Sequence, residues 1–226
     1  DGGLALAAAV AVAYRENGTR FPAPSMALGP DARSAAQNAE LIASQYPQLA
    51  YSRPADLIET LVEALRENQV LGMFKGRMEF GPRALCNRSI VYHPGDASAN
   101  DWLNQRMERT EFMPFAPVTA VEHAEACYVG WREDQVAADY MTMTYDCHAD
   151  FRARCPAVVH VDGTARPQAD PFMHALLHAW HARSGQPALI ITSFNRHEEP
   201  IVCAPQDALG ALEDGMVDLV VLGESL

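Results

Sequence analysis

From position 70 onward, short apolar segments alternate with segments that suit helices, and this alternation most limits the folds open to the chain. Apolar segments of four to six residues are typical of buried strands in an α/β sheet. The predicted strands are 70–74, 89–92, 117–121, 158–162, 188–192 and 217–222. The predicted helices among them are 97–108, 171–183 and 205–213. The pattern therefore predicts an α/β fold with a twisted open sheet, mixed rather than wholly parallel, and flanking helices.

Three further helices are predicted before this alternating region. Residues 2–16 are rich in alanine and end before an Asn-Gly pair, a common helix stop. Residues 21–30 contain three prolines and indicate a linker, after which Asp31 can cap a helix over 32–44. Residues 55–68 place aliphatic side chains on one face and charged side chains opposite, which predicts an amphipathic helix.

Composition limits the class of protein. Of the 226 residues, 49% are hydrophobic and 20% charged, which is ordinary for a globular protein with a sizeable core. The net charge of −12 argues against general binding to nucleic acid or to an anionic membrane, so neither is an expected partner. The five cysteines lack CxxC spacing, which favours free thiols in a reducing, cytoplasmic location. Because the chain begins with Asp1, we expect a piece of a longer protein.

The basic residues are unevenly placed. Only one of the seventeen is lysine, and five of the arginines fall between positions 77 and 109 of an acidic chain. Lys75, Arg77, Arg83 and Arg88 surround a Gly-Pro turn with a single carboxylate, between two apolar segments. Arginine forks match the oxygens of phosphate and carboxylate, so this stretch is a candidate anion site. The alternative is a solvated basic loop.

A second candidate stretch follows the predicted helix over 97–108. Asn104, Arg106 and Arg109 precede residues 112–117, which include two prolines and two phenylalanines. Such a rigid apolar wall can floor a pocket and hold Arg109 facing inward. The alternative is a core-packing loop with Arg109 in a structural salt bridge.

Two more polar segments follow predicted strands. Residues 160–166 turn through Asp-Gly to Thr164 and Arg166, while Ser193 and Asn195 follow the most apolar strand. Loops at the carboxyl ends of strands are common ligand positions in α/β sheets. The alternative for the second segment is an Asx or serine turn that closes the strand. The sequence contains no GxxxxGK[ST] or GxGxxG motif, so P-loop and Rossmann nucleotide binding are unsupported.

Two groups of cysteines and histidines could be imagined as metal sites. The first comprises Cys147, His148, Cys155 and His160, whose spacing matches no standard zinc pattern. The second comprises His174, His178 and His181, which recur at helical spacing. A helix face lying between core and solvent explains the second group, so no metal site is predicted there.

Four motifs occur in an order that resembles a known family. They are GRMEFGPRAL-NRSI, N-(x)4-RTEFMPFAP, HVDGTARPQ and TSFN-(x)3-EPIV, with DGGLALAAAV upstream. This set resembles the carboxy-terminal part of the NodU/TobZ-type O-carbamoyltransferases over nearly the whole chain. In that family an actin-like ATPase-fold domain is followed by a YrdC-like α/β domain. The resemblance implies that residues 1–28 are a helical remnant of the actin-like domain with its linker, and that residues 29–226 form the YrdC-like domain.

The resemblance also implies a two-step reaction. Carbamoyl phosphate and ATP, with Mg²⁺, would form carbamoyladenylate and release pyrophosphate in the YrdC-like domain. The actin-like domain of the same protein would then pass the carbamoyl group to a hydroxyl of a small-molecule acceptor. Asp1 matches a ligand for Fe²⁺ or a similar metal in that domain, where histidines from far upstream complete the site. Without those histidines, Asp1 is predicted to bind no metal in this chain.

The resemblance assigns roles to named residues. The predicted catalytic residues are Arg77, Arg83, Arg88 and Arg109. The predicted substrate- or nucleotide-binding residues are Lys75, Asn87, Asn104, Arg106, Thr164, Arg166, Ser193 and Asn195. Ser193 and Asn195 match the Ser-x-Asn that YrdC-like proteins use on the nucleotide, and Arg109 matches the arginine of their Lys-x-Arg motif. The arginines would screen charge as two anions meet.

Three positions depart from the family pattern. Cys86 stands where glycine is usual, so a tighter or less mobile turn is expected there. Met107 stands where many relatives have lysine, so a phosphate contact is expected to be missing or to come from Lys75 or Arg106. Ile191 replaces a usual asparagine.

Two alternative functions are open. One is threonylcarbamoyl-adenylate synthesis from bicarbonate and threonine, although the PRAL-NRSI and FMPFAP motifs favour carbamoyl phosphate. The other is a non-catalytic module that binds nucleotide or carbamoyl phosphate and becomes active only with its partner domain.

Overall fold

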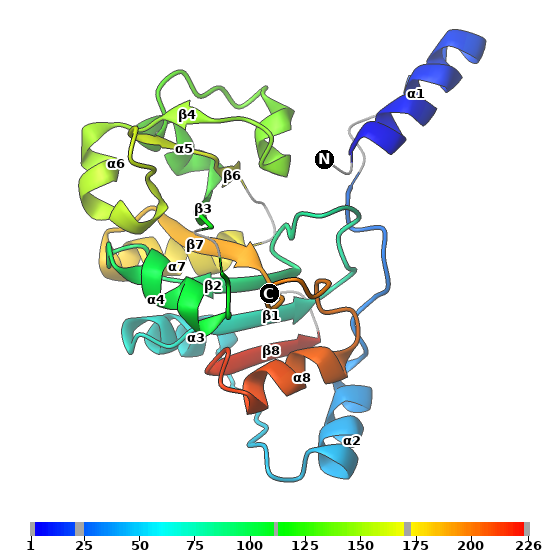
Figure 1. Ribbon diagram of the computed structural model, residues 1–226, viewed down its shortest axis with the longest axis vertical. Helices are drawn as coiled ribbons and strands as arrows, with labels where there is room; N and C mark the ends of the chain where they lie inside the picture. The colour runs from blue at the N-terminus through cyan, green and yellow to red at the C-terminus, as the bar shows by residue number, and fades with distance from the viewer. Residues whose placement is uncertain (1–2, 21–24, 111–112, 170–172, 224–226) are drawn as a thin grey trace.

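A computed structural model describes residues 3–20, 25–110, 113–169 and 173–223. At its centre lies a six-stranded sheet in the order β6-β3-β7-β2-β1-β8 (Figure 1). The strands are β1 (Leu71–Lys75), β2 (Arg88–Tyr92), β3 (Ala116–Thr119), β6 (Gln168–Ala169), β7 (Ala188–Ser193) and β8 (Leu219–Gly223). Antiparallel pairs join β1 to β2, β2 to β7 and β7 to β3, whereas β1 pairs with β8 and β3 with β6 in parallel. The predicted mixed sheet is therefore confirmed.

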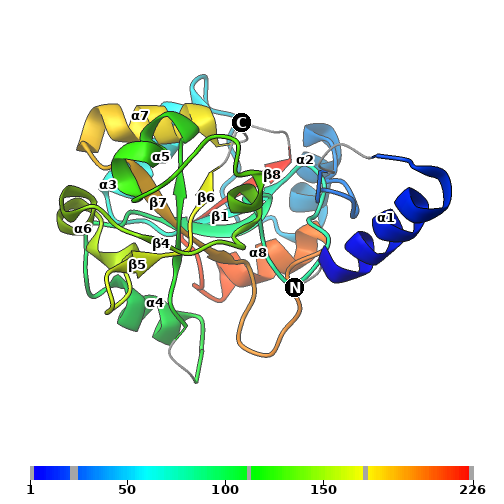
Figure 2. The same cartoon turned by 90° about the horizontal axis from the view of Figure 1, so that it is seen from above.

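Helices cover both faces of this sheet (Figure 2). The helices are α1 (Gly3–Asn17), α2 (Ala35–Gln45), α3 (Leu57–Arg66), α4 (Ala99–Arg106), α5 (Val121–Cys127), α6 (Ala149–Arg154), α7 (His174–Ser184) and α8 (Pro205–Glu213). Successive side chains of a strand point to opposite faces, and β1 shows the consequence. Leu71 and Met73 pack in one core with α3 and α7, whereas Phe74 packs in the other core with α4 and α8.

A smaller sheet pairs β4 (Tyr145–Asp146) with β5 (Thr164–Ala165), close to α5 and α6 (Figure 1). The predicted strand over 158–162 is wrong. Pro156–Val158 form a 3₁₀ helix, for which proline at the first position is well suited. The chain then turns at Gly163, whose φ is 85° and whose N–H donates to the carbonyl of His160 at 2.8 Å. A second 3₁₀ helix spans Val136–Tyr140.

The other predicted strands and helices are confirmed within a few residues, and the helix expected over 32–44 begins late. Ser34 caps α2, because its Oγ accepts a hydrogen bond from the N–H of Gln37 at 3.4 Å and the Gln37 side chain accepts one from the N–H of Ser34 at 3.1 Å. Asp31, the predicted cap, instead forms an isolated β-bridge with Arg77. The pattern did not predict the short helices α5 and α6.

The amino-terminal helix α1 lies apart from the sheet (Figure 1) and has no buried residue. Its Leu4 is 80% exposed although the side chain is apolar. The segment 26–32 differs, because four backbone hydrogen bonds of 2.7–2.8 Å join it to residues 76–80. The stretch that precedes the main domain is thus tied to the arginine-rich loop.

Candidate anion-binding site

Strand direction gathers most of the predicted binding segments at one edge of the sheet. β1 and β7 are parallel and end at this edge, at Lys75 and Ser193, and β2 begins there at Arg88. β3 and β6 run antiparallel to β7, so they also begin on this side. The segments before these two strands, which carry Arg109 and Arg166, therefore reach the same place. We call this side of the sheet, where β1 and β7 end and β2, β3 and β6 begin, the arginine edge.

Glu79 organises the loop between β1 and β2. It is buried, and its Oε1 accepts hydrogen bonds from the backbone N–H groups of Leu85 (2.6 Å), Asn87 (2.7 Å) and Arg88 (3.2 Å). A carboxylate that accepts several N–H bonds fixes the backbone around it. Sequence reasoning missed this role, although Glu79 is the single carboxylate in the arginine-rich stretch.

Arg88 is fully buried and serves the backbone of the same loop. Its Nη1 donates to the carbonyl of Lys75 at 2.6 Å and its Nη2 to that of Gly76 at 3.2 Å. Its guanidinium carbon lies 3.8 Å from the ring centroid of Phe74. Burial lowers the pKa of Arg88, and the charge of Glu79 opposes that shift. The geometry favours a structural role, and the catalytic role of Arg88 stays a prediction.

Arg83 and Arg166 come together from distant parts of the chain. Both are half-buried, one after the Gly-Pro turn and the other just before β6. Burial lowers the pKa of Arg166, and the positive charge of Arg83 lowers it further. Two guanidinium groups within electrostatic reach repel each other, and an anion bound near both would offset that repulsion.

Arg109 is held beside the end of β7. Its Nη2 donates to Thr192 Oγ1 at 3.0 Å, and its guanidinium carbon lies 5.6 Å from the ring centroid of Phe115. Burial lowers the pKa of Arg109. Within the described residues no carboxylate pairs with Arg109, so the structural salt bridge considered for it finds no support there. Phe112 of the predicted wall lies outside the described residues.

Ser193 and Asn195 form a small polar turn beyond β7. Ser193 Oγ donates to Asn195 Oδ1 at 2.6 Å, and Asn195 Nδ2 donates to the carbonyls of Arg196 (2.6 Å) and Glu199 (3.0 Å). Phe194 between them is fully buried and anchors the turn. The structure shows the Asx or serine turn that was predicted as the alternative. The ligand-binding interpretation is compatible with it, because the same polar groups lie at the arginine edge.

Two predicted binding residues of α4 hold the fold together. Arg106 places Nη1 and Nη2 at 3.0 and 2.7 Å from the carboxylate oxygens of Asp218. Asp218 directly precedes β8, at the edge opposite the arginine edge, so the geometry favours a structural role for Arg106, and its phosphate contact stays a prediction. Asn104 Nδ2 donates to the carbonyls of Asn100 (2.7 Å) and Met113 (3.0 Å), which secures the loop before β3.

Three other predicted residues make local contacts. Arg77 donates from Nε and Nη2 to the carbonyls of residues 28–29, at 3.0 and 2.8 Å. Asn87 Nδ2 donates to the carbonyl of Arg77 at 2.8 Å. Thr164 Oγ1 donates to Asp162 Oδ1 at 2.8 Å within a turn. Their ligand contacts stay predictions, as does that of Lys75, which is 1% exposed.

The three departures from the family pattern are buried. Cys86 has a φ of 77°, in the left-handed region that favours glycine. Met107 is fully buried in the core that α4 shares, so its side chain lies within the protein interior. Ile191 is also buried, inside β7.

Potential metal ligands converge at one place among the described residues, where Glu122 meets His174 and His178. The two histidines lie on a partly exposed side of α7, as predicted, but the contribution of Glu122 was missed because α5 was not predicted. The cysteine-containing group around Cys147 is not gathered in this way in the described structure. Asp1 lies outside the described residues.

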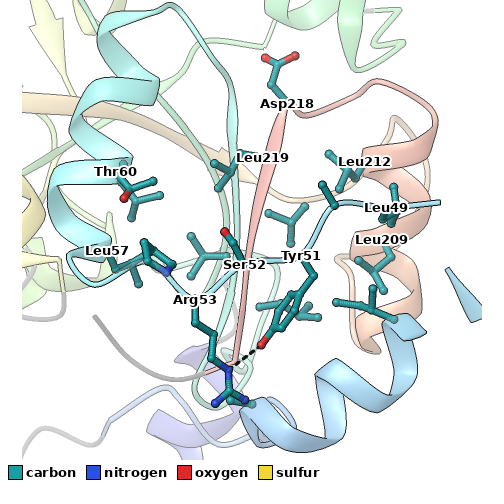
Figure 3. A pocket seen from close by; sticks show the side chains of 18 residues that line it. Leu49, Tyr51, Ser52, Arg53, Leu57, Thr60, Leu209, Leu212, Asp218 and Leu219 are labelled. Carbon is teal, nitrogen blue, oxygen red and sulfur yellow. Dashed lines mark hydrogen bonds between the residues drawn. The ribbon is translucent and has the colours of Figure 1, made fainter. Parts of the chain in front are cut away.

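A hollow of about 520 Å³ lies over β8 (Figure 3). The segment 49–54, α3 and α8 line it, and Leu57, Leu209 and Leu219 give it an apolar surface. None of the predicted anion-binding residues is among the residues described as lining this hollow. The arginine edge therefore remains the candidate anion-binding site. In the described part of the chain, none of the helices has the length and apolar character needed to cross a membrane.

The sequence resembles known proteins along most of its length. A family model described as "Carbamoyltransferase C-terminus" matches residues 62–226. Nodulation protein NolNO of Sinorhizobium fredii is 32% identical over the whole chain, which covers 34% of that protein. The 3'-hydroxymethylcephem-O-carbamoyltransferase of Amycolatopsis lactamdurans is 36% identical over 75% of the chain and 32% of its own length. The chain thus spans about a third of these relatives.

Two solved structures share the fold. Full-length HypF, solved in a phosphate- and nucleotide-bound form, superposes with a TM-score of 0.54 at 19% identity, over 81% of this chain and 27% of its own. HypF of T. kodakarensis gives a TM-score of 0.52 at 17% identity, over 75% of this chain and 22% of its own. At these identities the likeness concerns the fold alone.

Proposed function

This chain belongs to the carbamoyltransferase C-terminal family, and on that premise we propose that it forms carbamoyladenylate from carbamoyl phosphate and ATP. The resemblance drawn from the four motifs is confirmed at the level of the NodU-type family. Carbamoyl transfer in general follows from that membership. The adenylate intermediate, the use of ATP and the acceptor are the proposal.

The observation that carries the proposal is the pair of half-buried arginines, Arg83 and Arg166, with Arg109 at the same edge. Carbamoyl phosphate and ATP are both anions, so their mutual repulsion opposes the reaction. Arginine forks aimed at the phosphate oxygens offset that repulsion where the two substrates meet. We assign these three arginines to the phosphate groups. Glu79 and Arg88 position the loop that carries Arg83.

Ser193 and Asn195 are assigned to the nucleotide. They follow β7 directly, and buried Phe194 fixes the backbone between them. The hydroxyl and the amide already hydrogen-bond to each other at 2.6 Å. They would exchange this contact for the oxygens or nitrogens of the bound nucleotide. Mg²⁺ arrives with ATP as part of the substrate.

The proposed reaction balances when one water is consumed. Water cleaves carbamoyl phosphate to carbamate and inorganic phosphate. A carbamate oxygen then bonds to the α-phosphorus of ATP, and the bond from that phosphorus to pyrophosphate breaks. No covalent protein intermediate is needed, and burial raises the pKa of Cys127 and of Cys155 to about 12, so these thiols are not nucleophilic thiolates.

Transfer to the acceptor is assigned to a larger protein. Residues 1–28 would be the end of an actin-like domain with its linker, and residues 29–226 the YrdC-like domain. The lack of buried residues in α1 supports this division, because a largely apolar helix without buried residues gains from a covering partner. In that protein Asp1 would bind its metal, and the carbamoyl group would pass to a hydroxyl of a small molecule.

Pyrophosphate release from this chain with MgATP tests the proposal. Release should depend on carbamoyl phosphate and be accompanied by an equal amount of inorganic phosphate. Release that instead needs bicarbonate and threonine would mean threonylcarbamoyl-adenylate synthesis. Calorimetric binding of ATP without any release would mean a binding module that requires its partner domain.

Matched variants locate the activity. Arg83→Ala and Arg166→Ala should each lower carbamoyl-phosphate-dependent release by about 100-fold or more without unfolding the chain. Arg66→Ala is the control, because Arg66 is an exposed arginine that ends α3 before β1 begins at the opposite edge. If Arg83→Ala and Arg166→Ala release pyrophosphate as fast as Arg66→Ala, the arginine edge is not the active site.

A further inference from the structure

Helices α5 and α7 lie near each other (Figure 2), and four of the eight histidines and one glutamate meet between them. Glu122 and His123 come from the first turn of α5, and His174, His178 and His181 come from α7. Ring centroids lie 4.2 Å apart for His123 and His181, and 4.2 Å apart for His174 and His178. These five residues are called the histidine cluster.

Three donor atoms of the cluster face one another. The Glu122 carboxylate has Oε1 at 2.6 Å from His174 Nε2 and Oε2 at 3.6 Å from His178 Nε2. All three ligand atoms lie within 4.8 Å of one another. His174 and His178 are four residues apart on α7, so they share one helix face. Two imidazoles and a carboxylate form a donor set that binds zinc in other proteins.

Two ring nitrogens of the cluster lack a hydrogen bond among the described residues. Nε2 of His178 and Nε2 of His123 are buried atoms that make no hydrogen bond within the described structure. A buried polar atom without a partner costs free energy, and such atoms call for an explanation. The Glu122 carboxylate hydrogen-bonds to His174, but it lies 3.6 Å from His178 Nε2, which is too long for a hydrogen bond. A cation between the helices would account for His178 as well.

We propose that Glu122, His174 and His178 bind one divalent transition-metal ion such as Zn²⁺. Imidazole nitrogen favours this class of ion over Mg²⁺ or Ca²⁺, which prefer oxygen ligands. Tetrahedral bonds of about 2.0–2.1 Å would set the donor atoms about 3.3 Å apart, so small rotations of the three side chains suffice. The fourth position is open to water or to His123.

The site is separate from the proposed carbamoyl chemistry. β3 begins at the arginine edge and ends at Thr119, and α5 starts two residues later. Glu122 therefore lies toward the opposite edge of the sheet. A metal ion there would hold α5, which begins just after β3, against α7. We therefore expect the bound ion to raise the stability of the folded chain.

Zinc titration of the metal-free 226-residue chain tests this site. Calorimetry and thermal unfolding would be measured in a Cys203→Ser background, since Cys203 is an exposed free thiol that can also bind zinc. One equivalent of Zn²⁺ should bind and raise the midpoint of thermal unfolding. His174→Ala, His178→Ala and Glu122→Gln should each weaken binding by at least about tenfold.

His148→Ala is the matched control, because His148 is an exposed histidine at the start of α6 and outside the cluster. It should bind zinc like the parent chain. Glu122→Gln keeps the shape of the side chain, so it remains informative if an alanine variant fails to fold. A tetrahedral Co²⁺ absorption spectrum that is lost in Glu122→Gln would support the site. Equal zinc affinity in all variants, or no stoichiometric binding by the parent chain, would overturn it.

Discussion

Arg166 and Arg83, which are 83 positions apart in the sequence, are held within electrostatic reach of each other at one edge of the sheet. Burial lowers the pKa of Arg166, and the positive charge of Arg83 lowers it further. Nothing in chain folding requires two cations to meet. An anion bound near both guanidinium groups would offset the repulsion between them, as in many anion-binding sites.

Pyrophosphate should therefore stabilise the chain. At one hundred times its dissociation constant, it would raise the free energy of unfolding by about 2.7 kcal/mol. Arg83→Ala and Arg166→Ala should weaken this binding roughly 10- to 100-fold, since each removes hydrogen bonds to a charged group. Thermal unfolding with and without pyrophosphate measures the effect. An equal shift in both variants and in Arg66→Ala would show that the anion binds elsewhere.

Arg88→Ala should mainly lower the stability of the folded chain. The buried guanidinium donates to the carbonyls of Lys75 and Gly76 and stacks on Phe74, so its loss leaves unpaired carbonyls and a cavity. The free energy of unfolding should fall by at least about 3 kcal/mol in a denaturant titration. Arg88→Lys should not restore it, because an ammonium lacks the planar fork. A stable but inactive Arg88→Ala would instead support the catalytic role.

Met107→Lys should harm the protein instead of adding a phosphate contact. Met107 is fully buried, and an ammonium placed there must lose its hydration or its proton. We expect a loss of several kcal/mol in the free energy of unfolding, whereas Met107→Leu should cost less than about 1.5 kcal/mol. Chemical denaturation compares the two variants. Higher pyrophosphate release from a stable Met107→Lys would show that this lysine reaches the substrate.

Cys86→Gly should be tolerated. At a φ of 77° glycine avoids a strain of about 1–2 kcal/mol, but the buried thiol is lost and the unfolded chain gains freedom. The net change in the free energy of unfolding should stay within about 1 kcal/mol. Cys86→Val keeps a buried apolar side chain but is β-branched at the same φ, so it should be clearly less stable. Equal stability of both variants would contradict the left-handed conformation.

Asp218 should make stability depend on acid pH. Burial acts to raise the pKa of Asp218, but hydrogen bonds from Arg106 and from the N–H of Val70 leave it below its ordinary value. A carboxyl group with a lowered pKa in the folded state stabilises the fold above its unfolded pKa of about 3.9. This contribution is lost as the pH falls through the folded pKa.

Asp218→Asn should therefore lower the free energy of unfolding at neutral pH and have less effect below about pH 4. Denaturant unfolding from pH 3 to pH 7 measures the difference from the parent chain. Asp134→Asn is the control, because its partner Arg132 is exposed and the pair contributes little. A constant difference between Asp218→Asn and the parent at all pH values would contradict the prediction.

Periodicity was enough to predict five of the six strands of the central sheet, whereas the two-residue strand β6 was not predicted. The apolar run 188–192 is found as β7, and the pattern over 205–213 is found as α8. The predicted strand over 158–162 failed because Pro156 and Gly163 impose turns that an apolar count ignores. The seven-residue helix α5 was too short to show a helical period.

Tertiary contacts decided the roles of the site residues. Arg106 was assigned to phosphate by its place beside Arg109, but its partner Asp218 lies 112 positions away and could not be foreseen. Arg88 is fully buried whereas Arg83 is half-buried, a difference that residue type alone does not predict. Strand direction places the segments of Arg83 and Arg166 on the same side of the sheet, but β3 and β7 separate β6 from β2, so strand order alone does not predict that the two arginines interact.

Mass spectrometry of the reaction mixture can detect carbamoyladenylate itself. The chain would be mixed with MgATP and ¹³C-labelled carbamoyl phosphate and stopped within one turnover. The labelled adenylate should appear only when both substrates are present, and it should be absent with Arg166→Ala although that variant stays folded. Pyrophosphate release without any labelled adenylate, or the same yield from Arg166→Ala, would contradict the assignment of adenylate formation to the arginine edge.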